Sequence, residues 1–142
     1  MDYPVSEDIA EQQLADMEEE FGAIGDSGAR AILVDAAMRG LLDFDSENAT
    51  VTYRLQKPVS LEDGQSLTEL KLTEPDVSQI EQINKGIKVS FDKQGNASAD
   101  ASVQTQTIKR TIAVVAGIPD ALLNRAKRRD WAVMEALSGF FG

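Results

Sequence analysis

The spacing of the apolar residues changes along the chain from a helical period to a period of two and then returns. No other feature of the sequence constrains the fold as strongly. Up to Gly40 the apolar residues recur at steps of three and four, as in amphipathic helices. From Leu41 to about residue 73 they alternate with polar residues, as in half-buried strands, and helical spacing resumes after Pro75. We therefore predict an α+β fold with N-terminal helices, a small antiparallel β-sheet formed by hairpins at about 41–73, and a C-terminal helical cluster.

Two helices are predicted before the sheet. The first spans residues 6–21 and begins at Ser6, which is a suitable N-cap. Its apolar face contains Ala10, Leu14, Met17 and Phe21. The second spans residues 29–39, with Asp26 or Ser27 as a cap, and is apolar on most sides. Such a helix is buried either in the core or in an oligomer, and we predict the core.

A β-hairpin is predicted in the middle of the chain. Residues 51–55 alternate between apolar and polar side chains, which predicts a half-buried strand. Pro58 marks an edge or a bend, because proline cannot donate a hydrogen bond to a neighbouring strand. Asp63-Gly64 is predicted to form a two-residue turn, and the return strand ends before Pro75.

A short helix is predicted after the hairpin, with Asp76 as its cap. Its apolar stripe contains Val77, Ile80 and Ile83. The following segment, residues 87–102, has a weaker pattern. Within it, strand-like alternation is confined to Ile87, Val89 and Phe91.

Three short helical pieces are predicted in the last third of the chain, Thr107–Phe141. The stripe of the first contains Ile108, Ile112 and Val115. Gly117 is predicted to end this piece, and Pro119 to lie in the first turn of the second. Asp130 is predicted to open the third, because a carboxylate is favourable beside the unpaired N–H groups at the positive end of a helix.

The composition excludes much catalytic chemistry. The 142 residues contain no histidine and no cysteine, which removes the commonest general base, the commonest metal ligand and any disulfide. The glycines form neither of the common phosphate-binding motifs. Asp43, Asp45 and Glu47 alternate as at the start of a Ca²⁺ loop, but the glycine and the distal glutamate of such a loop are missing. Catalysis by carboxylates alone stays open, since two acids are sufficient in glycosidases. We predict a protein that is not an enzyme and has no metal or cofactor.

The sequence contains no apolar run of 18 or more residues, which predicts no transmembrane helix. The first residues are acidic, whereas a secretory signal is basic and then apolar. These features favour a cytoplasmic protein that does not bind membranes.

The charge is distributed unevenly along the chain. Residues 1–48 contain thirteen acids and two bases, whereas residues 103–142 contain three acids and six bases. The net charge of −10 argues against binding to nucleic acid. We predict that the acidic start lies against the basic end within one fold. The alternative is that an acidic partner binds the basic cluster, which contains Arg125, Lys127, Arg128 and Arg129.

The length and the patterns together predict one domain over residues 1–142. It would contain an acidic helical arm at 1–48, a β-hairpin and helix region at 49–102, and the C-terminal helices at 103–142.

Two segments of the sequence form an ordered pattern. VTYRLQKPVSLEDGQSLTELKLTEPDVSQI contains a strand ending in Pro-Val, a glycine-centred hairpin, and a strand that runs into a proline and a helix. TIAVVAGIPDALLNRAKRRDWAVMEALSGFF contains a helix, a Gly-Ile-Pro turn, a short helix, an aspartate and a final helix ending near a phenylalanine. In this order and spacing, residues 51–142 resemble the phage tail assembly chaperone family, which includes the small E, 41 and 14 proteins of long-tailed phages.

The resemblance implies a non-catalytic protein made in the cytoplasm of an infected or lysogenic bacterium. It implies binding to the tape-measure protein and assistance in tail tube assembly, with the tail tube protein as a further partner and possible formation of a homo-oligomer. Two other functions stay open. One is a structural component of the phage tail or the head–tail joint, and the other is an acidic regulatory or inhibitor protein that acts through residues 1–48.

A chaperone for a helical client needs apolar surface that is accessible together with charge that keeps the complex in solution. The candidate partner-binding residues are Arg128, Arg129, Trp131, Met134, Phe140 and Phe141. The alternative for the apolar members of this set is that they close the core, and the sequence does not decide between the two.

Overall fold

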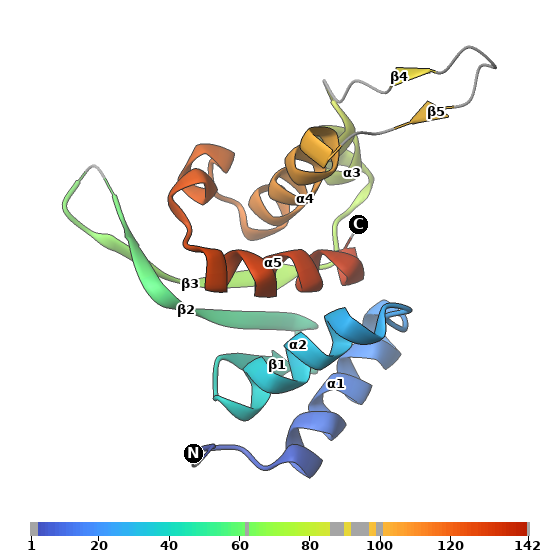
Figure 1. Ribbon diagram of the computed structural model, residues 1–142, viewed down its shortest axis with the longest axis vertical. Coiled ribbons are helices and arrows are strands. Elements are labelled where there is room, and N and C mark those ends of the chain that lie inside the picture. The colour runs from blue at the N-terminus through green and yellow to red at the C-terminus, as the bar shows by residue number, and fades with distance from the viewer. Residues whose placement is uncertain (1–2, 62, 86–89, 92–96, 99–100, 142) are drawn as a thin grey trace.

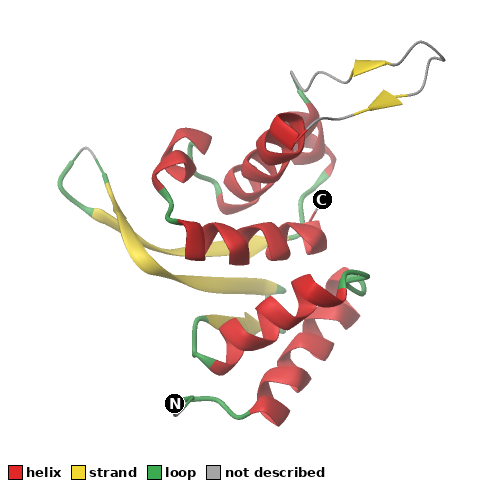
Figure 2. Cartoon of the chain, viewed as in Figure 1, coloured by secondary structure: helices red, strands yellow, loops and turns green. Residues whose placement is uncertain are grey.

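The computed structural model describes residues 3–61, 63–85, 90–91, 97–98 and 101–141. The helices are α1 (Glu7–Phe21), α2 (Ser27–Met38), α3 (Val77–Asn84), α4 (Ala101–Ala116), the 3₁₀ helix η1 (Asp120–Arg125) and α5 (Arg128–Phe141). The strands are β1 (Leu42–Asp45), β2 (Thr50–Ser60), β3 (Ser66–Thr73), β4 (Ser90–Phe91) and β5 (Ala97–Ser98). Helix α5 lies at the centre, where it contacts α2, α4 and β2 (Figure 1). Helices precede and follow a three-stranded antiparallel sheet, which confirms the predicted α+β fold (Figure 2).

The two N-terminal helices begin at the predicted caps. The Ser6 hydroxyl accepts a hydrogen bond from the Ile9 N–H at 3.3 Å, and the Asp26 carboxylate accepts from the N–H groups of Gly28 and Ala29. The buried face of α1 contains Ala10, Leu14 and Met17, as its spacing predicts. Helix α2 begins at Ser27, two residues earlier than predicted, because Asp26 provides its cap.

The sheet has the strand order β1-β2-β3, and all its pairs are antiparallel. Its buried side chains are Leu42, Val51, Tyr53, Leu55, Val59, Leu70 and Leu72. The hairpin between β2 and β3 lies at the predicted place, but its loop is longer than the predicted two residues. The innermost strand-like bond joins the Leu61 N–H to the Gln65 carbonyl at 2.8 Å. Inside the loop that this bond closes, the Gly64 N–H donates to the Leu61 carbonyl. Gly64 has a φ of +83°, which glycine adopts without strain.

Strand β2 is irregular at its centre. Its pairing with β3 shifts register between Arg54 and Val59. Pro58, which predicts an edge or a bend, lies within this irregular part and is exposed. The irregularity leaves the backbone of Gln56 and Lys57 outside the β2–β3 ladder.

The C-terminal elements differ from the prediction in their bounds. Helix α4 begins at Ala101, well before Thr107, and ends as predicted near Gly117, whose φ is +72°. The second piece is a 3₁₀ helix, and Pro119 is its N-cap instead of a member of its first turn. Helix α5 begins at Arg128, so Asp130 lies inside its first turn.

Helix α3 has the predicted cap but not the predicted buried stripe. Asp76 and Gln79 form a reciprocal capping box. Only Ile83 of the stripe is buried, whereas the side chains of Val77 and Ile80 are 72% and 44% exposed. The reason is that this short helix packs mainly against one neighbour, α4, which covers one narrow side of it. The strand-like positions Ile87 and Val89 lie outside the described residues.

A connected cluster of buried apolar side chains draws on α1, α2, the three-stranded sheet, α4, η1 and α5. At one end of it, the ring of Phe21 lies 5.8 Å from that of Phe44, 5.7 Å from that of Phe140 and 5.0 Å from that of Phe141, measured between centroids. This aromatic cluster joins the end of α1 to the end of α5. The core therefore includes both the N-terminal and the C-terminal helices.

Candidate partner-binding surfaces

Asp130 is a buried carboxylate that ties α5 to the irregular part of β2. One carboxylate oxygen accepts hydrogen bonds from the Tyr53 hydroxyl at 2.6 Å and the Gln56 N–H at 2.7 Å. The other accepts from the Lys57 N–H at 3.1 Å. The carboxylate thus supplies acceptors for two backbone N–H groups that the β2–β3 ladder leaves out. The prediction that Asp130 caps its own helix is wrong, because its buried carboxylate accepts hydrogen bonds from β2.

The tie continues through a short polar network to the end of α2. Gln56 donates to the Tyr53 hydroxyl at 3.3 Å, and Arg39 donates to the Gln56 side-chain oxygen at 2.9 Å. Burial raises the pKa of the Tyr53 hydroxyl, and the hydrogen bond to the Asp130 carboxylate raises it further. Tyr53 therefore keeps its proton and acts as a permanent donor. The start of α5 is held in one position relative to β2 and α2.

Four exposed cations surround this buried carboxylate. They form the basic patch, which we define as Lys57, Lys127, Arg128 and Arg129. With Gln56 and Asp130 they line a hollow of about 490 Å³. Within the part of the chain that the structure describes, none of these four side chains has an ion-pair or hydrogen-bond partner. Arg125, the other member of the predicted basic cluster, instead donates to the Ser60 carbonyl at 2.8 Å.

The ion pairs of the acidic arm lie within the arm itself. Arg30 donates to Glu11 at 2.6 Å and to Glu18 at 2.9 Å, and Asp35 lies 3.8 Å from Arg39. No ion pair between described residues joins residues 1–48 to the basic cluster at 125–129. The acidic start does lie against the basic end, as predicted, because α1 and α2 pack on α5. The described residues nevertheless form no ion pair across this contact. Arg30 forms the ion pairs with Glu11 and Glu18 because it lies on α2, which packs directly beside α1.

Burial raises the pKa of the Glu18 carboxyl, but hydrogen bonds from the Ile24 N–H and from Arg30 outweigh it, so this pKa lies below its ordinary value of 4.5. The ionised carboxylate therefore stabilises the fold above about pH 4.5, and this contribution is lost as the pH falls through the folded-state pKa. We expect Glu18→Gln to lower the melting temperature at about pH 7, and the difference from the wild type to shrink towards about pH 3. Thermal unfolding followed by circular dichroism measures both.

Glu19→Gln is the matched control for that experiment. Glu19 is exposed and has no ion-pair partner among the described residues. Its removal is expected to leave the melting temperature nearly unchanged at both pH values. Equal melting temperatures for Glu18→Gln and the wild type near neutral pH would contradict a stabilising role for the Arg30 contacts.

The apolar candidates for partner binding lie in or against the core. Met134, Phe140 and Phe141 are buried, and Trp131 is half-buried against the core cluster. Neighbouring residues on a helix point in different directions, but both phenylalanines are covered because α5 has packed neighbours on more than one side. Of the six candidates, Arg128 and Arg129 are exposed. A binding role for any of the six stays a prediction.

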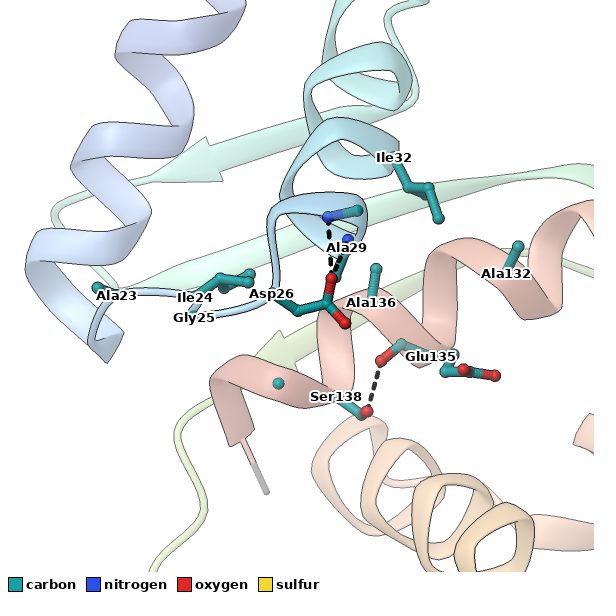
Figure 3. A pocket seen from close by; sticks show the side chains of 12 residues that line it. Ala23, Ile24, Gly25, Asp26, Ala29, Ile32, Ala132, Glu135, Ala136 and Ser138 are labelled. Carbon is teal, nitrogen blue, oxygen red and sulfur yellow. Dashed lines mark hydrogen bonds between the residues drawn. The ribbon is translucent and has the colours of Figure 1, made fainter. Parts of the chain in front are cut away.

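A second surface is a groove between α2 and α5, which the sequence analysis did not identify (Figure 3). Its volume is about 460 Å³. One wall is formed by the start of α2 and the turn before it, and contains Gly25, Gly28, Ala29 and Ile32. The other wall is formed by α5 and contains Ala132, Glu135, Ala136 and Gly139. We call these eight residues the small-residue groove. Ile32 is 40% exposed there. The spacing of Ala132, Ala136 and Gly139 on one side of a helix is a signal that could have revealed it.

Among the described residues, no helix is long and apolar enough to span a bilayer. No group of three or more acidic side chains among them is placed to hold a metal ion.

One comparison with known proteins gives a match. Residues 52–142 match the family described as phage tail assembly chaperone proteins, E, or 41 or 14. The matched part is more than half of the chain and holds β3, α3, α4, η1 and α5 with nearly all of β2. No curated protein and no solved structure matches the chain.

Proposed function

Because the chain belongs to the phage tail assembly chaperone family, we propose that it binds the tape-measure protein and assists assembly of the tail tube without catalysing a reaction. The observation that carries this proposal is the family match over residues 52–142. The absence of histidine and cysteine from the sequence supports a non-catalytic role. The place of action would be the cytoplasm of the bacterial host, where tails are assembled, and the tail tube protein would be a second partner.

The small-residue groove is the surface that we propose for the tape-measure protein. Small side chains on both walls allow the backbone of a client helix to come close, and the exposed part of Ile32 offers an apolar contact. Asp26 and Glu135 lie at the same groove, so basic residues flanking an apolar stripe of the client would be favoured. Covering such a stripe reversibly would keep the long client from aggregating until the tube forms around it.

Co-expression tests this proposal. The partner is the product of the long, helix-rich reading frame from the same genome that encodes the tape-measure protein. We expect the wild-type chain to raise the soluble fraction of that protein severalfold and to be purified with it. Ile32→Glu should abolish both effects, because it places a charge in the groove beside Asp26 and Glu135.

Ile9→Glu is the matched control, since Ile9 is an apolar residue on α1 that is 62% exposed and lies outside the groove. It should behave as the wild type. A tape-measure protein whose solubility does not respond to the wild-type chain would overturn the proposed function. Full activity of Ile32→Glu would overturn the assignment of the groove alone.

Mass spectrometry of purified virions separates the chaperone from a structural tail component. We expect the chain to be absent from the finished particle. Its presence in amounts comparable to tail proteins would favour the structural role instead.

We also infer that residues 1–142 act as one domain in which the acidic arm at 1–48 is integral. The arm provides the edge strand β1, the aromatic ring of Phe21 against Phe141, and the α2 wall of the groove. An arm packed in this way is less suited to act as a detachable inhibitor. A chain without residues 1–48 is expected to lose cooperative unfolding.

A further inference from the structure

We propose that the basic patch binds the acidic helix α1 of a second copy of this chain, so that copies associate head to tail. The two surfaces are different, lie on one molecule, and have opposite charge. The inference rests on charge and geometry, and it does not depend on which client the protein has.

The basic patch lies where positive charge is least favourable within one molecule. Lys127, Arg128 and Arg129 surround the first turn of α5, which is the positive end of the helix dipole. Lys57 adds a fourth positive charge from β2, and all four side chains lack a partner among the described residues. Asp130, the one acid in the first turn of α5, is enclosed and uses its oxygens for Tyr53, Gln56 and Lys57. An anionic surface brought here from outside would therefore relieve repulsion that the fold itself leaves in place.

Helix α1 has the complementary arrangement. It contains seven acids and no base, and Arg30 neutralises only Glu11 and Glu18. Five acids stay exposed on it: Glu7, Asp8, Asp16, Glu19 and Glu20. Glu19 and Glu20 lie in the last turn, at the negative end of the helix dipole, where further acids are unfavourable.

The two charged ends are kept apart within one chain. Phe21 follows Glu20 directly and packs against Phe140 and Phe141 at the far end of α5. The basic patch surrounds the opposite end of this 14-residue helix. At 1.5 Å per residue, such a helix is about 20 Å long. The acids in the last turn of α1 therefore cannot reach the patch of their own chain, but those of another copy can.

A contact between two different surfaces is heterologous, so each bound copy presents a free patch at one end and a free α1 at the other. Such contacts form rings or open helical assemblies. Each copy has a net charge of −10, which opposes association at long range. At about 0.1 M salt the Debye length is about 10 Å, so the long-range repulsion between copies is screened more strongly than the charge pairs at the contact. At about 1 M salt the charge pairs at the contact are weakened as well.

Sedimentation velocity of the purified full chain tests the proposal. At about 0.1 M salt we expect the average mass to rise with protein concentration, and at about 1 M salt to fall back towards the monomer. The patch variant Arg128→Gln/Arg129→Gln and the acid variant Glu19→Gln/Glu20→Gln should each need at least tenfold more protein to associate. An equimolar mixture of the two variants should form a pair that stops at one copy of each, because only one productive contact remains.

Two control variants remove the same number of charges elsewhere. Lys71→Gln/Lys85→Gln and Glu74→Gln/Glu81→Gln change exposed residues outside both surfaces and should associate as the wild type. Circular dichroism verifies that each variant is folded. A wild-type chain that is monomeric at all concentrations, a patch variant that associates normally, or a mixture that stays monomeric would each overturn the proposal. The first result would favour an acidic partner other than this chain.

Discussion

Asp130→Ala is expected to lower the free energy of unfolding by about 3–5 kcal/mol, because Asp130 is one of two buried polar side chains among the described residues and accepts three hydrogen bonds. The substitution leaves the Tyr53 hydroxyl and the N–H groups of Gln56 and Lys57 without their acceptor. An unsatisfied buried donor costs about 1–3 kcal/mol, and the partial exposure of Gln56 allows water to replace part of the loss. Urea unfolding, followed through the fluorescence of Trp131, the one tryptophan in the chain, measures the change.

Asp130→Asn and Tyr53→Phe show how this energy is divided. Asparagine keeps one acceptor oxygen and nearly the same shape, so it should cost clearly less than alanine. Tyr53→Phe removes one donor and leaves the two backbone bonds to Asp130, which predicts a cost of about 1 kcal/mol. If Asp130→Ala changed the free energy of unfolding by less than about 1 kcal/mol, the tie between α5 and β2 would not be a major source of stability.

Phe141→Ala is expected to cost about 3–5 kcal/mol, which is usual for truncation of a buried phenylalanine. The ring is 5% exposed and packs 5.0 Å from the ring of Phe21 and 6.2 Å from that of Phe140. Its loss would open a cavity at the place where α1 meets α5. A double-mutant cycle with Phe21→Ala should give a coupling of about 0.5–1.5 kcal/mol beyond the lost area, as for other edge-on aromatic pairs.

Val77→Ala is the control for this truncation, because Val77 is an apolar residue that is 72% exposed. It should change the free energy of unfolding by no more than about 0.5 kcal/mol. A small effect for Phe141→Ala as well would contradict its place in the core, and would return Phe140 and Phe141 to the set of docking candidates.

Both substitutions bear on the proposed function through the position of α5. This helix forms one wall of the small-residue groove and begins at the basic patch. Asp130 holds its start against β2, and Phe140 and Phe141 hold its end against α1. The spacing of the two proposed binding surfaces therefore depends on contacts at both ends of one helix.

The sequence by itself determined the elements whose signals are local. Ser6, Asp26 and Asp76 act as predicted caps because a cap bonds to N–H groups two or three residues away. The alternation around Tyr53 predicted β2, because side chains on a strand point to opposite faces. The order of these elements was sufficient for the resemblance that the family match over residues 52–142 confirms.

Only the tertiary structure decided which of these elements meet. Asp130 has the local environment of a helix cap, but its partner Tyr53 lies 77 residues earlier, just before a register shift that the sequence indicates only through Pro58. Phe140 and Phe141 are both buried because α1 closes over the end of α5. The basic patch has no ion pair among the described residues because the acids of α1 lie at the other end of α5 and pair with Arg30. Caps and strand periods depend on neighbours in the sequence, whereas burial, ion pairing and the groove depend on which distant surfaces pack together.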